Sequence, residues 1–226
     1  MYFWYWDLIL LVPAFLLSLY AQYKVKSTFA RYSEIPSSRG LTGAQAARIL
    51  LDSAGLMNVG IEVGGGTLSD HYDPRTRMLS LSPPVGQSSS LAALGVAAHE
   101  AGHAMQHAEG YLAFRLRSAI VPVANIGSNL GMILFFVGLI FFRSGLLMNI
   151  GILLFSAAVL FTVVTLPVEF NASRRAVVQL ENKSILVGDE LAGAKKVLSA
   201  AALTYVAAAL MAILQLVRLL LISRRS

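Results

Sequence analysis

Apolar residues gather into four long runs along the chain, separated by two long polar segments and by a short polar break at 143–145. Each run reaches the roughly 20 residues that a helix needs to cross the hydrocarbon core of a membrane. We therefore predict transmembrane helices at 1–23, 119–142, 146–166 and 200–222. The last run has an alternative, because Gln215 and Arg218 interrupt it and such a helix can instead lie along the membrane surface.

Charged and aromatic residues at the ends of these runs predict their orientation. Aromatic residues at 2–6 form one end of the first run, and Lys24 and Lys26 follow the other end. Arg115 and Arg117 precede the second run. Because basic residues concentrate on the cytoplasmic side of membranes, we expect the N-terminus outside and residues 24–118 in the cytoplasm.

Two observations bear on the ends of the chain. No basic stretch precedes the first apolar run, so a membrane anchor is favoured over a cleavable signal peptide. Arg224 and Arg225 would lie outside in a four-helix arrangement, against the usual charge distribution.

The polar segment 24–118 carries the signals of two helices. Thr42 and Gln45 have the spacing of a capping box, and the amphipathic stretch after them stops at Gly55. Serines at 88–90 provide N-cap candidates for a second, alanine-rich helix at about 91–108.

Short strands are predicted between these two helices, at 59–63 and 77–82. The strand at 77–82 either offers a free edge that holds an extended peptide or forms a plain hairpin. With a further polar segment at 167–199, the chain is predicted to be a mainly α membrane protein. Its 24–118 region should form a small α+β domain.

Composition supports a membrane protein. Hydrophobic residues make up 56% of the chain and charged residues 13%, and the mean hydropathy is +0.66. The net charge of +6 is placed mainly at the flanks of apolar runs, which favours membrane anchoring over nucleic-acid binding. The chain has no cysteine, so disulfides and cysteine-ligated zinc sites are excluded.

The helix at 91–108 carries the sequence His-Glu-Ala-Gly-His at 99–103. On a helix, His99 and His103 share one face and can bind one metal ion, while Glu100 can reach a water on that metal without ligating it. This is the pattern of a zinc hydrolase in which a carboxylate accepts and returns a proton. Chance would give roughly 0.002 such matches in a chain of this composition.

A third ligand is needed, because catalytic zinc sites usually have three protein ligands. The positions where metzincins have Gly and His hold Gln106 and Glu109, which excludes that class. No Asp, Glu or His occurs from 110 to 168, and the next acid is Glu169. Two predicted spans separate it from the motif, so both face the same side of the membrane.

Pro167 is expected to close the third span and to open a new helix that carries Glu169. Ser173 lies on the same face of that helix and can hydrogen-bond a ligand. The alternative for Glu169 is a charge favoured by the helix dipole at a helix N-terminus.

Four further residues are candidates for supporting ligands or touching substrate. His107 continues the row of histidines, but three successive turns of a straight helix do not converge on one tetrahedral ion. His71 is either a competing ligand or, with Tyr72, a donor to a developing oxyanion. The alternative for both is an ordinary loop residue. Arg175 follows the Glu169 region and is the fourth candidate.

Three stretches resemble a known family in order and spacing: SDHYDPRTRMLSLSPPV, AAHEAGHAMQHAEGY and LPVEFNASRRA. They are similar to the YugP-like membrane zinc metallopeptidases (neutral zinc metallopeptidase family 2) over about residues 41–175. More distantly, they resemble the HtpX and CAAX-prenyl endopeptidase group. The resemblance implies a gluzincin core with zinc on His99, His103 and Glu169 and with Glu100 as the acid and base.

The chain departs from these families at two positions. Ser173 stands where the wider group has Asp, and Asn171 stands where the closer family is expected to have Asp. The natural substrate does not follow from the resemblance.

The expected function is that of a membrane-embedded zinc endopeptidase acting on protein or peptide substrates at the cytoplasmic membrane surface. One alternative is a catalytically silent scaffold that partners other membrane proteins or a second copy of itself. An intact Glu100 argues against it. Another alternative is a zinc hydrolase of a non-peptide amide or a lipid-linked substrate.

Overall fold

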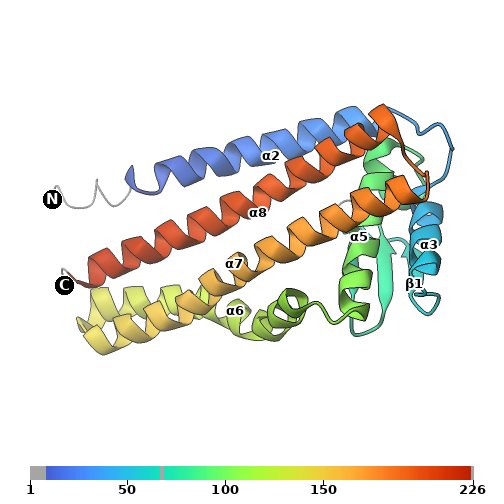
Figure 1. Cartoon of the computed structure of the whole chain (residues 1–226). Helices are drawn as coiled ribbons and strands as arrows, with labels where there is room; N and C mark the ends of the chain where they lie inside the picture. Colours follow the sequence, from blue (N-terminus) through green and yellow to red (C-terminus); the bar gives the residue numbers. More distant parts are fainter. Residues whose placement is uncertain (1–8, 67–68, 225–226) are drawn as a thin grey trace. The chain divides into compact units, whose positions relative to one another are not determined.

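The computed structural model describes residues 9–66 and 69–224, most of them in helices (Figure 1). The chain divides into two compact units. The apolar unit comprises Met1–Gln22, Arg115–Pro167 and Leu203–Ser226. The polar unit comprises Tyr23–Phe114 and Val168–Ala202. Four helices contribute residues to both units: α2 (Val12–Ser33), α6 (Leu112–Val137), α7 (Gly145–Asn182) and α8 (Gly188–Ser223).

In the polar unit, the first predicted helix is confirmed as α3 (Gly43–Ser53). Both hydrogen bonds of the capping box between Thr42 and Gln45 are present. Gly55, just beyond the helix, has a positive φ of 75°, a conformation that glycine adopts without steric cost. The sequence signals therefore placed both ends of this helix correctly.

Three short strands form one sheet in the order β1-β3-β2. β1 (Gly60–Val63) pairs in parallel with β3 (Met78–Leu81), and β2 (His71–Asp73) pairs antiparallel with β3. The prediction of a free edge at 77–82 is wrong, because β3 has a strand on each side. The plain hairpin is confirmed, and the sheet edges belong to β1 and β2.

The second predicted helix is confirmed as α5 (Leu91–Ala108), with the Ser90 hydroxyl accepting a hydrogen bond from the Ala93 N–H. It packs against α3, the short helix α4 (Pro83–Gly86) and the sheet. Its many alanines and glycines let other elements approach on nearly every side, so α5 forms the centre of the polar unit's core.

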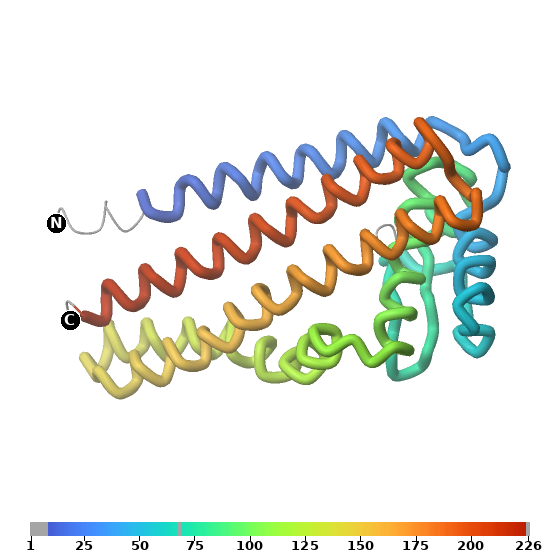
Figure 2. Tube along the Cα trace, in the orientation of Figure 1, coloured from blue at the N-terminus to red at the C-terminus, as the bar shows by residue number. Residues whose placement is uncertain are grey.

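In the apolar unit, α6 (Leu112–Val137) continues into a π-helical turn, η1 (Gly138–Phe142), and α7 begins at Gly145. The two helices run side by side (Figure 2). A Cβ on Gly151 would lie 2.6 Å from the carbonyl oxygen of Gly131, so the two backbones are in close contact. Such small residues are typical of helix pairs in membranes.

Within the described residues, three helices are long and apolar enough to cross a membrane: Leu112–Phe142, Gly145–Asn182 and Gly188–Ser223. Only 28%, 17% and 17% of the residues in their most apolar windows are buried by the protein itself, so lipid is the natural covering for the rest. The runs predicted at 119–142, 146–166 and 200–222 each lie within one of these helices.

The first predicted span, 1–23, includes residues 1–8, which lie outside the described residues. The described helix in this region, α2, is not one of the three helices of spanning character. The count of four spans therefore stays a prediction.

The helix boundary predicted at Pro167 is wrong, although the two compact units do divide there, between Pro167 and Val168. Pro167 lies inside α7, which continues from Gly145 to Asn182 without a break. Proline removes one backbone donor and usually kinks or ends a helix. It is tolerated in long apolar helices where neighbouring helices and hydroxyl side chains satisfy the freed carbonyl groups. The predicted third span and the predicted ligand helix are therefore one element.

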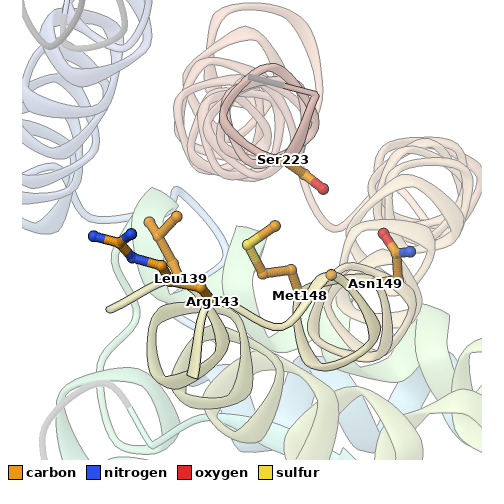
Figure 3. A pocket seen from close by; sticks show the side chains of 6 residues that line it. Leu139, Arg143, Met148, Asn149 and Ser223 are labelled. Carbon is orange, nitrogen blue, oxygen red and sulfur yellow. The ribbon is translucent and has the colours of Figure 1, made fainter. Parts of the chain in front are cut away.

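A cavity of about 540 Å³ lies in the apolar unit, where the turn between η1 and α7 meets the end of α8 (Figure 3). It is lined by Leu139, Arg143, Gly145, Met148, Asn149 and Ser223. None of these residues is a histidine or a carboxylate, so this cavity lacks the groups of a hydrolytic metal site. The candidate metal ligands lie in the polar unit.

Candidate metal centre

The centre is built on the middle of α5. The ligand atoms of His99, Glu100 and His103 all lie within 4.8 Å of one another. The two imidazole rings are perpendicular, at 84°, with centroids 4.7 Å apart. The helix thus presents two histidines and a carboxylate from adjacent turns, as the motif predicts.

Glu169, on α7, faces both histidines. Its Oε2 lies 3.1 Å from His99 Nε2 and 3.7 Å from His103 Nε2. Tetrahedral zinc with bonds of about 2.0–2.2 Å places neighbouring ligand atoms about 3.4 Å apart. The two observed separations lie on either side of that value, so the Glu169 carboxylate stands about as far from each histidine as a shared zinc ion would require.

Gly102 explains how α7 comes so close to α5. A Cβ at this position would lie 2.8 Å from the carbonyl oxygen of Ala172, which is closer than a real side chain allows. Ala172 is itself fully buried and stands three residues after Glu169. The glycine of the motif therefore lets the backbone that carries Glu169 pack directly on the helix that carries the histidines.

The centre is buried and contains two carboxyl groups. Glu100 is 9% exposed and Glu169 is 2% exposed. Burial by itself lowers the pKa of His103, but the side chains of Glu169, Glu100 and Gln106 outweigh it and leave that pKa above its ordinary value. An environment that attracts a proton to an imidazole also favours a divalent cation.

The second ring nitrogen of each histidine has a hydrogen-bond partner. His99 Nδ1 lies 3.1 Å from Ser173 Oγ, the contact that the spacing of Ser173 predicts. His103 Nδ1 lies 3.0 Å from Gln106 Oε1. Histidines that bind metals through Nε2 usually donate their Nδ1–H to such a partner, which orients the ring.

Comparison with known proteins decides the family. The family model described as "Putative neutral zinc metallopeptidase" matches residues 7–224. The chain is also 49% identical over 213 residues to "Putative membrane protease YugP" of Bacillus subtilis (strain 168), covering 94% of each protein. No solved structure matches the chain.

The chain belongs to the neutral zinc metallopeptidase family. The resemblance of the three sequence stretches to this family is confirmed. Zinc is therefore the metal that the cluster on α5 is suited to bind, since the family is one of zinc peptidases and the histidine and glutamate side chains converge.

Gln106 also belongs to the candidate site, although the sequence analysis did not single it out as a member. Gln106 is fully buried, and its Nε2 donates to the Val168 carbonyl at 2.8 Å and to Asn171 Oδ1 at 2.9 Å. The available signal was its position three residues after His103, which places both side chains on neighbouring turns of one helix face.

Arg175 and Glu109 complete the surroundings of Asn171. Arg175 Nε donates to Asn171 Oδ1 at 2.7 Å, and its two terminal nitrogens pair with the Glu109 carboxylate at 2.5 and 2.7 Å. The Arg175 guanidinium lowers the pKa of Glu109. Arg175 was proposed from the sequence as a residue that supports the site, but Glu109 was not.

The remaining candidates lie along α5 and the sheet. The Tyr72 hydroxyl lies 2.9 Å from His107 Nδ1, and the His107 ring stacks on Phe114 with centroids 5.9 Å apart. Tyr72 and His107 also line a cavity of about 210 Å³ beside Ala104. His71 is exposed on β2, with its Nδ1 2.7 Å from the Ser69 carbonyl. The roles predicted for these residues stay predictions.

Gly102→Ala is expected to separate the metal ligands. The new methyl group must displace Ala172 and with it Glu169, so we expect a loss of about 1–3 kcal/mol in stability and a zinc affinity reduced roughly tenfold or more. Thermal unfolding in detergent and competition with a zinc chelator measure the two effects.

Gly95→Ala is the matched control, because it makes the same change on the same helix. The added Cβ would meet its nearest atom, Ala194 Cβ, at an ordinary 3.4 Å. Equal zinc affinities for the two variants would show that close packing at Gly102 does not govern the ligand geometry.

Proposed function

We propose that the protein is a membrane-embedded zinc endopeptidase of the gluzincin type that hydrolyses peptide bonds in protein or peptide substrates. His99, His103 and Glu169 hold the zinc, and Glu100 is the catalytic acid and base. The observation that carries this proposal is the convergence of two imidazole Nε2 atoms on the Glu169 carboxylate, with Glu100 beside them.

Zinc bound by these residues would polarise water and lower its pKa towards neutrality. Glu100 accepts a proton from the attacking water and returns it to the nitrogen of the leaving amine. Its low exposure keeps it out of bulk solvent, and its place beside His99 on α5 holds it next to the ligands. Ser173 and Gln106 hold the two imidazoles in the orientation that ligation needs.

We further propose that the site lies at the cytoplasmic surface of a multi-pass membrane protein. Lys24 and Lys26 lie close to the start of the polar unit, and Arg115 and Arg117 close to the end of its first segment. Basic residues in such positions favour the cytoplasmic side. The membrane location itself is supported by three helices of spanning character and by the relative's name.

Glu100→Gln is expected to abolish proteolysis while zinc stays bound. The amide keeps the shape of the side chain but cannot accept the proton, so cleavage should fall by at least about 100-fold. Casein digestion by the detergent-purified protein, with and without chelator, measures the activity, and metal analysis measures the zinc.

The outcomes of that experiment separate the competing functions. Chelator-sensitive cleavage that is lost in the Gln variant supports the endopeptidase. Zinc binding without proteolysis favours a scaffold or a hydrolase of another substrate, and undiminished cleavage by the variant would refute the role of Glu100.

Glu169→Ala is expected to weaken zinc binding by more than about 100-fold, since even residues that only support ligands contribute 10- to 100-fold. Glu181→Ala removes an exposed carboxylate from the same helix and serves as the control. Chelator competition measures both affinities. A Glu169→Ala protein that binds zinc as tightly as the control would exclude Glu169 as a ligand.

Single cysteines test the sidedness, because the natural chain has none. Met57→Cys probes the polar unit at a side chain that is 73% exposed, and Arg143→Cys probes the exposed turn between α6 and α7. In intact cells, a membrane-impermeant maleimide should label the cysteine at 143 but reach the one at 57 only after permeabilisation. The reverse pattern would place the site outside.

A further inference from the structure

We propose that Gln106 is a positioning residue that fixes the proton of His103 on Nδ1 and so leaves Nε2 free to bind zinc. The inference deepens the proposed function, because it rests on His103 being a zinc ligand. It concerns a residue outside the motif, and its readouts do not depend on which substrate the protein cleaves.

The side chain of Gln106 is held at both ends. Its Oε1 lies 3.0 Å from His103 Nδ1, and its Nε2 donates to the Val168 carbonyl and to Asn171 Oδ1. The residue is fully buried, so water does not compete for these bonds. One amide thus joins a metal ligand on α5 to the backbone and a side chain of α7.

A path of hydrogen bonds runs from His103 through Gln106 and Asn171 to Arg175. Arg175 determines which atoms along this path donate and which accept. Arg175 can only donate, so the Asn171 atom that it contacts must be the oxygen. The Val168 carbonyl can only accept. Two acceptors therefore face the same end of Gln106, and that end must be the NH₂ group.

The orientation of Gln106 then determines the state of His103. With its NH₂ group directed at α7, Gln106 presents its oxygen to His103, and an oxygen of this kind only accepts. His103 Nδ1 must therefore carry a hydrogen. A neutral imidazole has one N–H, so Nε2 keeps its lone pair, and Nε2 is the atom that faces Glu169.

His99 provides an internal contrast. Its Nδ1 partner is the hydroxyl of Ser173, which can either donate or accept. The Ser173 contact therefore orients the His99 ring without dictating its protonation. Of the two histidines, only His103 has its tautomer fixed, because the groups that orient Gln106 cannot switch between donating and accepting a hydrogen bond.

The far end of the path is itself anchored on α5. Arg175 is paired through two nitrogens with Glu109, the residue that directly follows the helix. The path therefore begins at His103, crosses to Asn171 and Arg175 on α7, and returns to Glu109. Bidentate pairing of this kind restrains the guanidinium better than a single contact does.

Two substitutions of Gln106 separate positioning from packing. Gln106→Leu removes the acceptor for His103 and the two donors to α7. Gln106→Glu keeps an acceptor for His103 but loses those donors, so it should lower thermal stability while preserving the His103 contact. Gln179→Leu makes the same change at a half-buried glutamine on α7 and serves as the control.

Zinc affinity is measured by chelator competition on the purified full-length protein. We expect it to fall roughly 10- to 100-fold in Gln106→Leu and to stay within about threefold of wild type in Gln106→Glu and Gln179→Leu. Nitrogen-15 NMR of the zinc-loaded protein, labelled only at its four histidines, gives a second readout. The Nδ1 proton of His103 should exchange slowly in wild type and in Gln106→Glu, and rapidly in Gln106→Leu.

Either of two results would overturn the inference. An unchanged zinc affinity in Gln106→Leu would show that the contact does not matter for the metal. An equal loss in Gln106→Glu and Gln106→Leu would show that Gln106 only packs α5 against α7. A protein that binds zinc but cleaves nothing would refute the proposed activity alone, whereas one that binds no zinc would refute both proposals.

Discussion

The buried carboxylate of Glu169 is the constraint on which the centre depends. Removing a carboxylate from water costs several kcal/mol unless a positive charge or well-placed donors compensate for it. Here the compensating groups are the imidazoles of His99 and His103, and a metal ion when one is bound. A carboxylate on α7 meets this requirement only where α7 lies in close contact with α5. Gly102 makes that contact sterically possible, because the backbone of the buried Ala172 packs directly against it.

The same contact explains why the surroundings of the ligands are polar although they are buried. Where two helices pack without large side chains between them, their polar groups must satisfy one another. Gln106, Asn171 and Arg175 do so in a continuous path, and Ser173 serves His99 separately. The site is therefore supported by residues from both helices, and neither helix alone supplies a complete set of partners.

These features differ in how far the sequence predicts them. The histidines and Glu100 follow from spacing on one helix, and the capping box at Thr42 places α3 in the same local way. Glu169 was inferred from an absence, the acid-free stretch before it. That inference needed no knowledge of packing, and the structure brings its side chain to the two imidazoles.

Features that depend on the packing of separate helices and strands could not be predicted from local sequence patterns. β3 lies in the middle of the sheet because β1 pairs with it in parallel, and that pairing is set by tertiary packing. Gln106 becomes part of the site only because the Val168 carbonyl and Asn171 on another helix face it. Pro167 was read as a boundary from local chemistry, whereas α7 continues through it.

The continuity of α7 has a consequence for how the centre is completed. Residues 145–167 of this helix belong to the apolar unit, and Glu169 follows within the next turn. No loop separates the two parts, because only Val168 stands between Pro167, the last residue of the apolar segment, and Glu169. Glu169, Asn171, Ser173 and Arg175, which surround the candidate centre, therefore follow the apolar segment directly on the same helix.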